Sequence, residues 1–414
     1  MRYRKTFTDT TFMSLRWSVA DGRISRGLKW FSYAVTTFIV CLIAYLGLIL
    51  IRRHYVRADI ERFYADERAI ALAVGPSSRD HRLAKDIPKD KPLRILILEG
   101  GAIKGVISVK LMMFLEKMSG KRIGEMFDVI SGISIGSLET IMLSVPGPDG
   151  RPKYSATDLL NFFRYKTGPA FNMSFADRLG TANGLLLPLL SPRNNTRILK
   201  EIVGDRLRVS DLLGAVLVAG YDIHDRKLAF FCTDEAPFSE REDFLVYQLL
   251  AGTAAMPGFM GPNEITSVTG KRTLLLADPG LILNNPIMAA LVYATYLHPD
   301  NRKVIAFLGL GLEDKYTRHK STYYYNGLLG LANLYPGMTA APDKLFKSYI
   351  SYAGHDHNFN LSSDDTFFID DGLDENLSGD LDTSAANLDR LEQLADEIID
   401  RQRPQLLELV AKLK

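Results

Sequence analysis

The chain has 414 residues, of which 47% are hydrophobic and 24% charged, and its formal net charge is +2. So large an apolar share excludes intrinsic disorder, because a buried core can offset the entropy lost when the chain orders. Two cysteines cannot form a disulfide scaffold in a chain of this length, and the balanced charge gives no argument for nucleic-acid binding. The mean hydropathy is close to zero, which is high for so charged a chain and indicates unevenly distributed apolar residues.

Residues 30–51 form a predicted transmembrane helix, because these 22 consecutive residues carry no charge. As a helix they would extend roughly 33 Å, enough to cross a hydrocarbon core of about 30 Å. Trp30 lies at one end, and Lys29 and Arg52 close the two ends. A cleaved signal peptide would have a shorter apolar stretch and a cleavage site, and a core helix would carry a polar stripe. We therefore expect a single-pass anchor after a basic tail at residues 1–29.

The orientation of this anchor stays open, because basic residues flank it in similar numbers. Four lysine or arginine residues lie in 10–29 and five in 52–71, so the positive-inside rule does not decide which membrane face carries the rest of the chain. The next segment, residues 52–90, is predicted to be a connector. It has helical apolar spacing over 60–74, followed by a polar linker that contains proline.

The remainder, residues 91–414, has the pattern of one α/β domain. Short apolar runs alternate with stretches of helical period, and these runs lie at 93–98, 127–131, 215–220, 273–277 and 304–310. Buried strands that alternate with helices predict a mostly parallel sheet covered on both faces. Apolar residues at helical spacing predict one terminal helix over 385–413, and the aspartate-rich stretch 364–382 is typical of a solvated loop.

The first motif with chemical meaning is the sequence G-I-S-I-G at 132–136. It follows a predicted strand and precedes a predicted helix, which is the context of a nucleophile elbow. The glycines permit a tight turn, and the hydroxyl of Ser134 is then exposed at the start of the helix. The pattern alone arises by chance in roughly one such chain in seven, so the context carries the argument.

The second motif is a glycine-rich turn, E-G-G-A-I-K-G at 99–105, directly after the first strand. Such a turn directs backbone N–H groups at an anion, which is either the oxyanion of a reaction or a bound phosphate. The spacing does not fit a P-loop, and it fits a dinucleotide-binding fingerprint poorly. A purely structural turn between strand and helix is the third alternative.

The third motif is Asp278, which follows the predicted strand 273–277. Open α/β sheets place their ligands at the carboxyl ends of strands. None of the seven histidines lies in such a context. If Ser134 is a nucleophile, Asp278 therefore has to deprotonate it directly, and burial has to raise its pKa from the reference value of about 3.9.

These three motifs, in this order, resemble the patatin-like phospholipases, a family of lipid acyl hydrolases with a Ser-Asp dyad. The family pattern is D-G-G-G-x-[RK]-G, then G-x-S-x-G, then D-G-[GA], and this chain has E-G-G-A-I-K-G, G-I-S-I-G and D-P-G. The segment LLAGTAAMPGF at 249–259 also resembles the family. The similarity covers roughly residues 93–312.

The resemblance implies a three-layer α/β/α fold with a mostly parallel central sheet, in which 91–414 is the catalytic domain. It implies that Ser134 is the nucleophile and Asp278 the proton acceptor. The implied oxyanion hole consists of the backbone amides around Gly100, Gly101 and Ala102. The residues implied to support the motifs are Lys104, Gly105, Gly132, Gly136 and Gly280.

The chain departs from the family pattern at several positions. Ala102 replaces a glycine, which we expect to be tolerated only with a negative φ. Pro279 replaces a glycine directly after the proposed base and removes a backbone N–H. Glu99 replaces an aspartate at the strand end. None of these changes removes the nucleophile or the base.

We therefore expect a membrane-anchored phospholipase A or lysophospholipase-like enzyme that needs no cofactor and no metal. Its expected partners are a phospholipid or lysophospholipid substrate and the bilayer, and no nucleic acid; the oligomeric state is not predicted. The alternatives are a membrane-tethered nucleotide- or phosphate-binding module and a catalytically silent scaffold. The apolar stretch 159–190 is equally compatible with a cap over the acyl site and with ordinary core.

Overall fold

The computed structural model describes residues 21–76, 87–171, 173–182, 184, 186–236, 239, 241–310, 355–356, 358–370 and 381–414. The chain divides into two compact units, Met1–Ala58 and Asp59–Lys414. This division falls inside the predicted connector. The first unit consists, in its described part, of most of the long N-terminal helix, and the second contains the sheet.

The N-terminal helix α1 extends over Asp21–Val74 and includes the predicted span 30–51. By length and composition it is able to cross a membrane. The predicted helix is thus confirmed as a long apolar helix, and its final turns continue beyond the predicted anchor without a break.

Within the described residues, nine strands form one mixed sheet, with the path β5-β6-β3-β2-β1-β7-β9-β8 and β4 paired to β3. The strands β3, β2, β1, β7 and β9 run parallel and form its centre. They are β1 (Leu93–Leu98), β2 (Val129–Gly132), β3 (Ala215–Asp222), β7 (Lys303–Leu308) and β9 (Leu361–Ile369). The antiparallel additions are β4 (Lys227–Cys232), β5 (Asn263–Thr266), β6 (Thr273–Ala277) and β8 (His355–Asp356).

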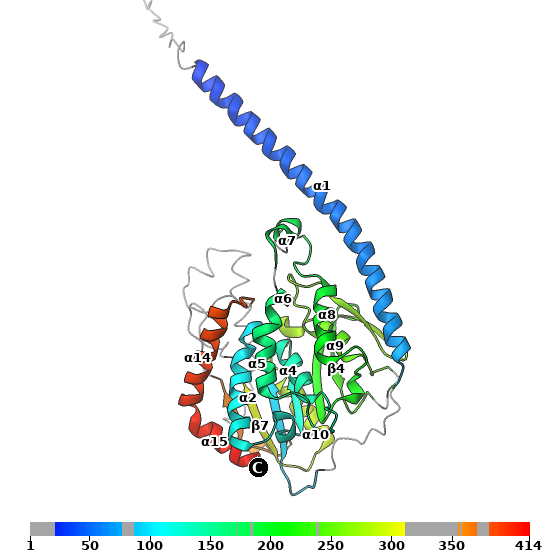
Figure 1. The fold of residues 1–414 in the computed structure, drawn as a ribbon, viewed down its shortest axis with the longest axis vertical. Coiled ribbons are helices and arrows are strands. Elements are labelled where there is room, and N and C mark those ends of the chain that lie inside the picture. Colours follow the sequence, from blue (N-terminus) through cyan, green and yellow to red (C-terminus); the bar gives the residue numbers. More distant parts are fainter. Residues whose placement is uncertain are drawn as a thin grey trace, which may run out of the picture. The chain divides into compact units, whose positions relative to one another are not determined.

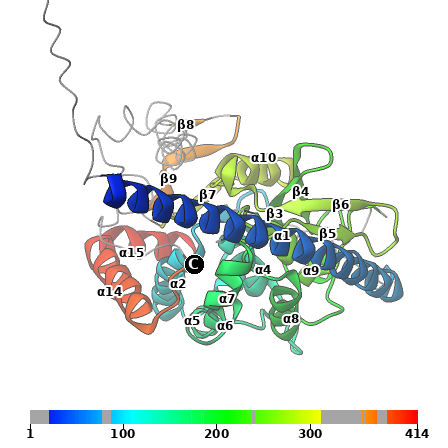
Figure 2. The ribbon, with the colours of Figure 1, turned by 90° about the horizontal axis from the view of Figure 1, so that it is seen from above.

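Helices cover both faces of this sheet, as the side chains of β1 show. Leu96 and Leu98 point into one core cluster, whereas Ile95 and Ile97 point into a second cluster with Leu291. The second face is covered by α10 (Ile287–Leu297), which Figure 2 shows on the opposite side of the sheet from α2 and α8. The main cluster draws on α2 (Gly105–Ser119), α4 (Ile135–Ser144), α5 (Ala156–Tyr165), α8 (Pro192–Val203), α9 (Val246–Thr253), α14 (Ala385–Arg401) and α15 (Arg403–Lys412), several of which are labelled in Figure 1.

The predicted three-layer α/β architecture with a mostly parallel sheet is confirmed, and all five predicted strands are present. Two expectations about secondary structure are wrong. The C-terminal helix breaks at Gln402 into α14 and α15, because Pro404 near the start of α15 cannot continue the hydrogen-bond ladder. The predicted acidic loop at 364–382 is wrong over 364–369, which belong to strand β9, where Phe367 and Ile369 are buried. Residues 371–380 of this stretch lie outside the described residues.

Candidate active site

Ser134 occupies a sharp turn between β2 and α4. Its φ of 53° and ψ of −118° lie in a region that residues other than glycine rarely adopt, at a cost of about 1–3 kcal/mol. The two glycines of the motif make the turn possible by their lack of a side chain. A Cβ on Gly132 would lie 2.1 Å from the carbonyl oxygen of Gly136, and one on Gly136 would lie 2.5 Å from that of Leu98. The geometry is that of a nucleophile elbow.

The hydroxyl of Ser134 donates a hydrogen bond to the carboxylate of Asp278. That carboxylate also accepts a hydrogen bond from the backbone N–H of Gly280 at 2.8 Å. Burial raises the pKa of Asp278 from 3.8 to about 6, against the lowering effect of these two hydrogen bonds. At neutral pH the group is ionised and is a stronger base than an exposed aspartate.

The sheet register explains why two residues 144 positions apart meet. Leu217 pairs with both β2 and β4, and Tyr221 pairs with both β4 and β6, so β2 and β6 use the same edge of β3. They run in opposite directions along it, since β2 is parallel and β6 antiparallel to β3. The ends of β2 and β6 thus face each other across a short gap that contains Ser134 and Asp278.

Sequence reasoning placed Asp278 at the carboxyl end of a strand in a mostly parallel sheet. Its strand β6 runs antiparallel to β3. The rule that ligands bind at the carboxyl ends of parallel strands therefore does not explain the position of Asp278. The proline that follows it fits the local geometry. Pro279 is the first residue of a 3-10 turn, where a backbone N–H has no partner within the turn, and the N–H of Gly280 binds the carboxylate instead.

The glycine-rich turn lies directly beside Ser134. A Cβ on Gly100 would be 3.2 Å from the Cβ of Ser134 and 2.9 Å from Oδ1 of Asn284. The N–H of Gly100 donates to the carbonyl oxygen of Asn284 at 3.3 Å. The turn continues through Gly101 into a 3-10 segment, Ala102–Lys104. The structure thus brings all three sequence motifs together.

Ala102 has a φ of +50°, so the expectation of a negative φ at this position is wrong. The left-handed conformation costs a residue with a side chain about 1–2 kcal/mol. The motif residue Gly105 starts α2, where a Cβ would lie 2.5 Å from Oε1 of Glu139. Burial raises the pKa of Glu139 well above its ordinary value. This carboxyl group is hydrogen-bonded to the hydroxyl of Ser108, and it packs α4 against α2.

Sequence reasoning assigned no role to Asn284, which the structure places at the site. Its side-chain amide donates to Oε1 of Glu99 at 3.1 Å, and Oε2 of Glu99 accepts from the N–H of Leu310 at 3.0 Å. Glu99 is therefore a buried bridge between the glycine-rich turn, the loop before α10 and the end of β7. The sequence shows Glu99 as an acid at a strand end, but it gives no indication that Asn284, 185 residues away, is its partner.

An apolar cavity of about 70 Å³ adjoins Ser134. Helices α5, α8 and α9 form its walls together with α6 (Thr167–Phe171). Phe162 and Phe171, from the stretch predicted as either cap or core, are among the lining residues. The exposed helix α7 (Phe175–Gly180) follows. Its lining is predominantly apolar, as in sites that bind hydrocarbon groups.

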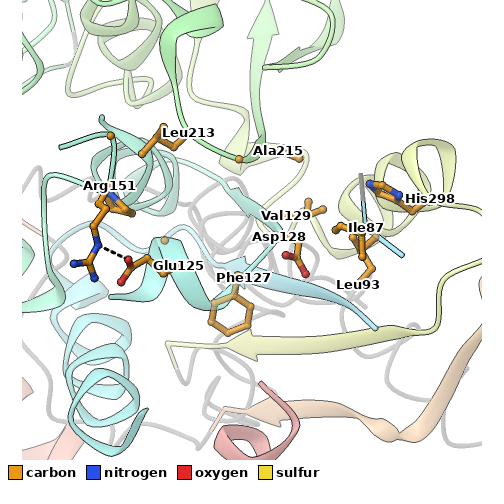
Figure 3. A pocket seen from close by; sticks show the side chains of 14 residues that line it. Ile87, Leu93, Glu125, Phe127, Asp128, Val129, Arg151, Leu213, Ala215 and His298 are labelled. Carbon is orange, nitrogen blue, oxygen red and sulfur yellow. Dashed lines mark hydrogen bonds and ion pairs between the residues drawn. The ribbon is translucent and has the colours of Figure 1, made fainter. Parts of the chain in front are cut away.

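A second cavity, of about 190 Å³, lies at the opposite edge of the sheet. Its lining includes Leu93, Val129 and Ala215, which are the first residues of β1, β2 and β3. Figure 3 shows its rim, where Arg151 donates to Glu125 at 2.7 Å. Ser134 follows the other end of β2, so this cavity is separate from the candidate active site.

The chain is similar to patatin-like phospholipases. Residues 96–291 match the family model for patatin-like phospholipases. Patatin-like protein 1 of Oryza sativa subsp. indica is 30% identical over 215 residues, which cover 49% of this chain and 51% of that protein. Patatin-like protein 1 of Arabidopsis thaliana is 26% identical over 358 residues, covering 75% of this chain and 84% of that protein.

Patatin group M-2 of Solanum tuberosum is 28% identical over 220 residues, covering 50% of this chain and 54% of that protein. The chain thus spans about half the length of most of these relatives. Among solved structures, VipD from Legionella pneumophila aligns over 75% of this chain and 67% of its own. The sequence identity of this alignment is 13% and its TM-score is 0.30.

Proposed function

Because this chain carries a patatin-like phospholipase domain, we propose that it is a membrane-anchored serine hydrolase that cleaves fatty-acyl esters of glycerophospholipids or lysophospholipids. The family implies lipid acyl hydrolase activity. The observation that carries the proposed Ser-Asp mechanism is the hydrogen bond from Ser134 to Asp278, at a strained turn beside an apolar cavity.

In the proposed reaction, the Ser134 hydroxyl oxygen attacks the ester carbonyl while Asp278 takes the hydroxyl proton. Asp278 then passes this proton to the leaving alcohol, and an acyl-enzyme remains. Water attacks the acyl-enzyme, loses its proton to Asp278, and the fatty acid leaves as the proton returns to Ser134. One water molecule is thus consumed for each ester bond broken.

The oxyanion that forms on the carbonyl needs hydrogen-bond donors. Of the three residues that the family resemblance implies, Gly100 already donates its N–H to Asn284. We therefore assign the donors to the backbone amides of Gly101 and Ala102, and we assign Gly100 the role of bringing the turn close to Ser134. The left-handed conformation of Ala102 supports a turn whose direction is fixed before substrate binds.

The long apolar helix α1 supports the anchor in this proposal. A hydrolase tethered to a bilayer is held at a high local concentration of its lipid substrate. Attaching a reporter to the C-terminus and testing its accessibility from each side of the membrane would identify the leaflet that the enzyme faces. Complete release of the protein from the membrane into the aqueous phase would refute the anchor.

Labelling with a fluorophosphonate tests the nucleophile. Wild-type protein in detergent should be labelled, and Ser134→Ala should not be labelled. Ser119→Ala, at the far end of α2, is the matched control and should be labelled as the wild type is. Persistent labelling of Ser134→Ala would refute Ser134 as the nucleophile.

A further inference from the structure

The last turns of α1, residues 59–74, belong to the unit that contains the sheet. Phe63, Glu67 and Ala71 lie on one face of the helix at four-residue spacing, and all three are buried. Ala71 is part of the main core cluster. Glu67 is therefore a carboxylate in the middle of a buried face, with only 7% of its surface exposed. A charge in such a place is stable only with partners.

Glu67 binds two helices at once. Its carboxylate accepts hydrogen bonds from Nζ of Lys200 in α8 at 2.7 Å and from the hydroxyl of Tyr247 in α9 at 2.6 Å. The side-chain amide of Gln248 donates to the backbone carbonyl of Glu67 at 2.8 Å. Nζ of Lys200 also lies 4.6 Å from the centroid of the Tyr247 ring. One carboxylate therefore joins α8 to α9.

Arg208 fixes the end of the same helical segment. Its Nε donates to the carbonyl oxygen of Gly75 at 2.8 Å, and its Nη2 donates to that of Val74 at 3.1 Å. A guanidinium at the C-terminus of a helix satisfies carbonyl groups that have no partner within the helix. The segment is thus held at its end as well as at Glu67.

The two helices that Glu67 joins are walls of the apolar cavity beside Ser134, which we call the acyl cavity. Leu199, next to Lys200, lines this cavity, and so does Leu250, which lies three residues after Tyr247. Directly beyond α9, the carbonyl oxygen of Ala255 accepts a hydrogen bond from the backbone N–H of Asp278 at 3.0 Å. The helix α9 thus connects the Glu67 contact to the cavity and to the proposed base.

We propose that Glu67 is a positioning residue for the acyl site, which sets the acyl-chain selectivity of the enzyme through α8 and α9. This inference rests on the proposed function. Glu67 does not line the cavity, so it acts through Lys200 and Tyr247. Because the cavity holds only about 70 Å³ and protein interiors are close-packed, a small displacement of either wall changes which chains fit.

The test uses the full-length protein in detergent micelles, with p-nitrophenyl butyrate as the short-chain substrate and p-nitrophenyl laurate as the long-chain one. Rates are normalised to the active sites titrated with a fluorophosphonate. We expect Glu67→Ala to change the long-to-short ratio of kcat/KM at least threefold and to move the pH midpoint of kcat/KM. Tyr247→Phe should change the ratio in the same direction. Asp66→Ala, an exposed carboxylate one residue away, should match the wild type.

A role in folding alone would lower the Tm and the titrated fraction, but it would leave the ratio and the pH midpoint unchanged. That result in Glu67→Ala would overturn the proposal. If Glu67→Ala does not fold, Tyr247→Phe decides, because it removes a single hydroxyl; an unchanged ratio there would also overturn it. A wild type that neither reacts with the fluorophosphonate nor turns over the esters refutes the proposed function, and this inference with it.

Discussion

Replacing Asp278 with asparagine should abolish activity and stabilise the fold. Burial raises the pKa of this carboxyl from 3.8 to about 6, so the ionised group destabilises the folded state. Two pKa units correspond to about 3 kcal/mol at pH 7. The penalty is absent below pH 4, grows as pH rises to about 6, and is complete above that. Asparagine keeps a carbonyl oxygen for the N–H of Gly280 and carries no charge.

Thermal unfolding of wild type and Asp278→Asn, followed at several pH values in the same detergent, measures this effect. For a unit of roughly 350 residues, unfolding entropy of about 2.1 cal/mol/K per residue makes 3 kcal/mol equal to about 4 °C in Tm. The variant should therefore melt higher at pH 7 and at the same temperature as the wild type below pH 4. Ser134→Ala is the control that also loses activity but keeps the charge. A Tm for Asp278→Asn equal to or below the wild-type value at pH 7 would refute the reasoning.

Three further predictions concern the same site. The kcat/KM of the wild type should rise with pH to half its maximum at about pH 6, because Asp278 acts only when ionised; a flat pH–rate profile between pH 5 and 7 would contradict this. Ala102→Gly should raise the free energy of unfolding by roughly 0.5–1 kcal/mol, because the relief of left-handed strain exceeds the entropy cost of glycine. Denaturant unfolding measures this change. Gly100→Ala should lower kcat/KM at least tenfold in ester assays with little change in Tm, since its Cβ would press on Ser134 and Asn284.

Much of the fold could be predicted because its signals are local. The strand β1 is a run of apolar residues. The G-x-S-x-G motif after β2 already indicates a tight turn, in which a side chain on Gly132 or Gly136 would clash with the backbone. The pairing of Ser134 with Asp278 was also predictable, since no histidine stood in a comparable context and the two residues follow strands. In these cases the residue type and its immediate neighbours carry the information.

The features that sequence reasoning missed depend on residues far apart in the chain. Asn284 is held at the site by Glu99, 185 positions away, and by the N–H of Gly100. The antiparallel direction of β6 depends on which part of β3 is left open beyond β2, and no local pattern encodes that. The positive φ of Ala102 is imposed by the turn around it, against the preference of alanine. Tertiary structure overrides local preference at these places.

The shared edge of β3 limits how this protein can change in evolution. The distance between Ser134 and Asp278 is set by the number of residues in β2 and β6, which approach each other along that edge. An insertion or deletion of one residue in either strand would turn the following side chain to the other face of the sheet, and two residues would shift it by about 6.6 Å. Substitutions can accumulate in both strands. Changes in the number of residues between the last pair with β3 and either Ser134 or Asp278 should be absent from active homologues.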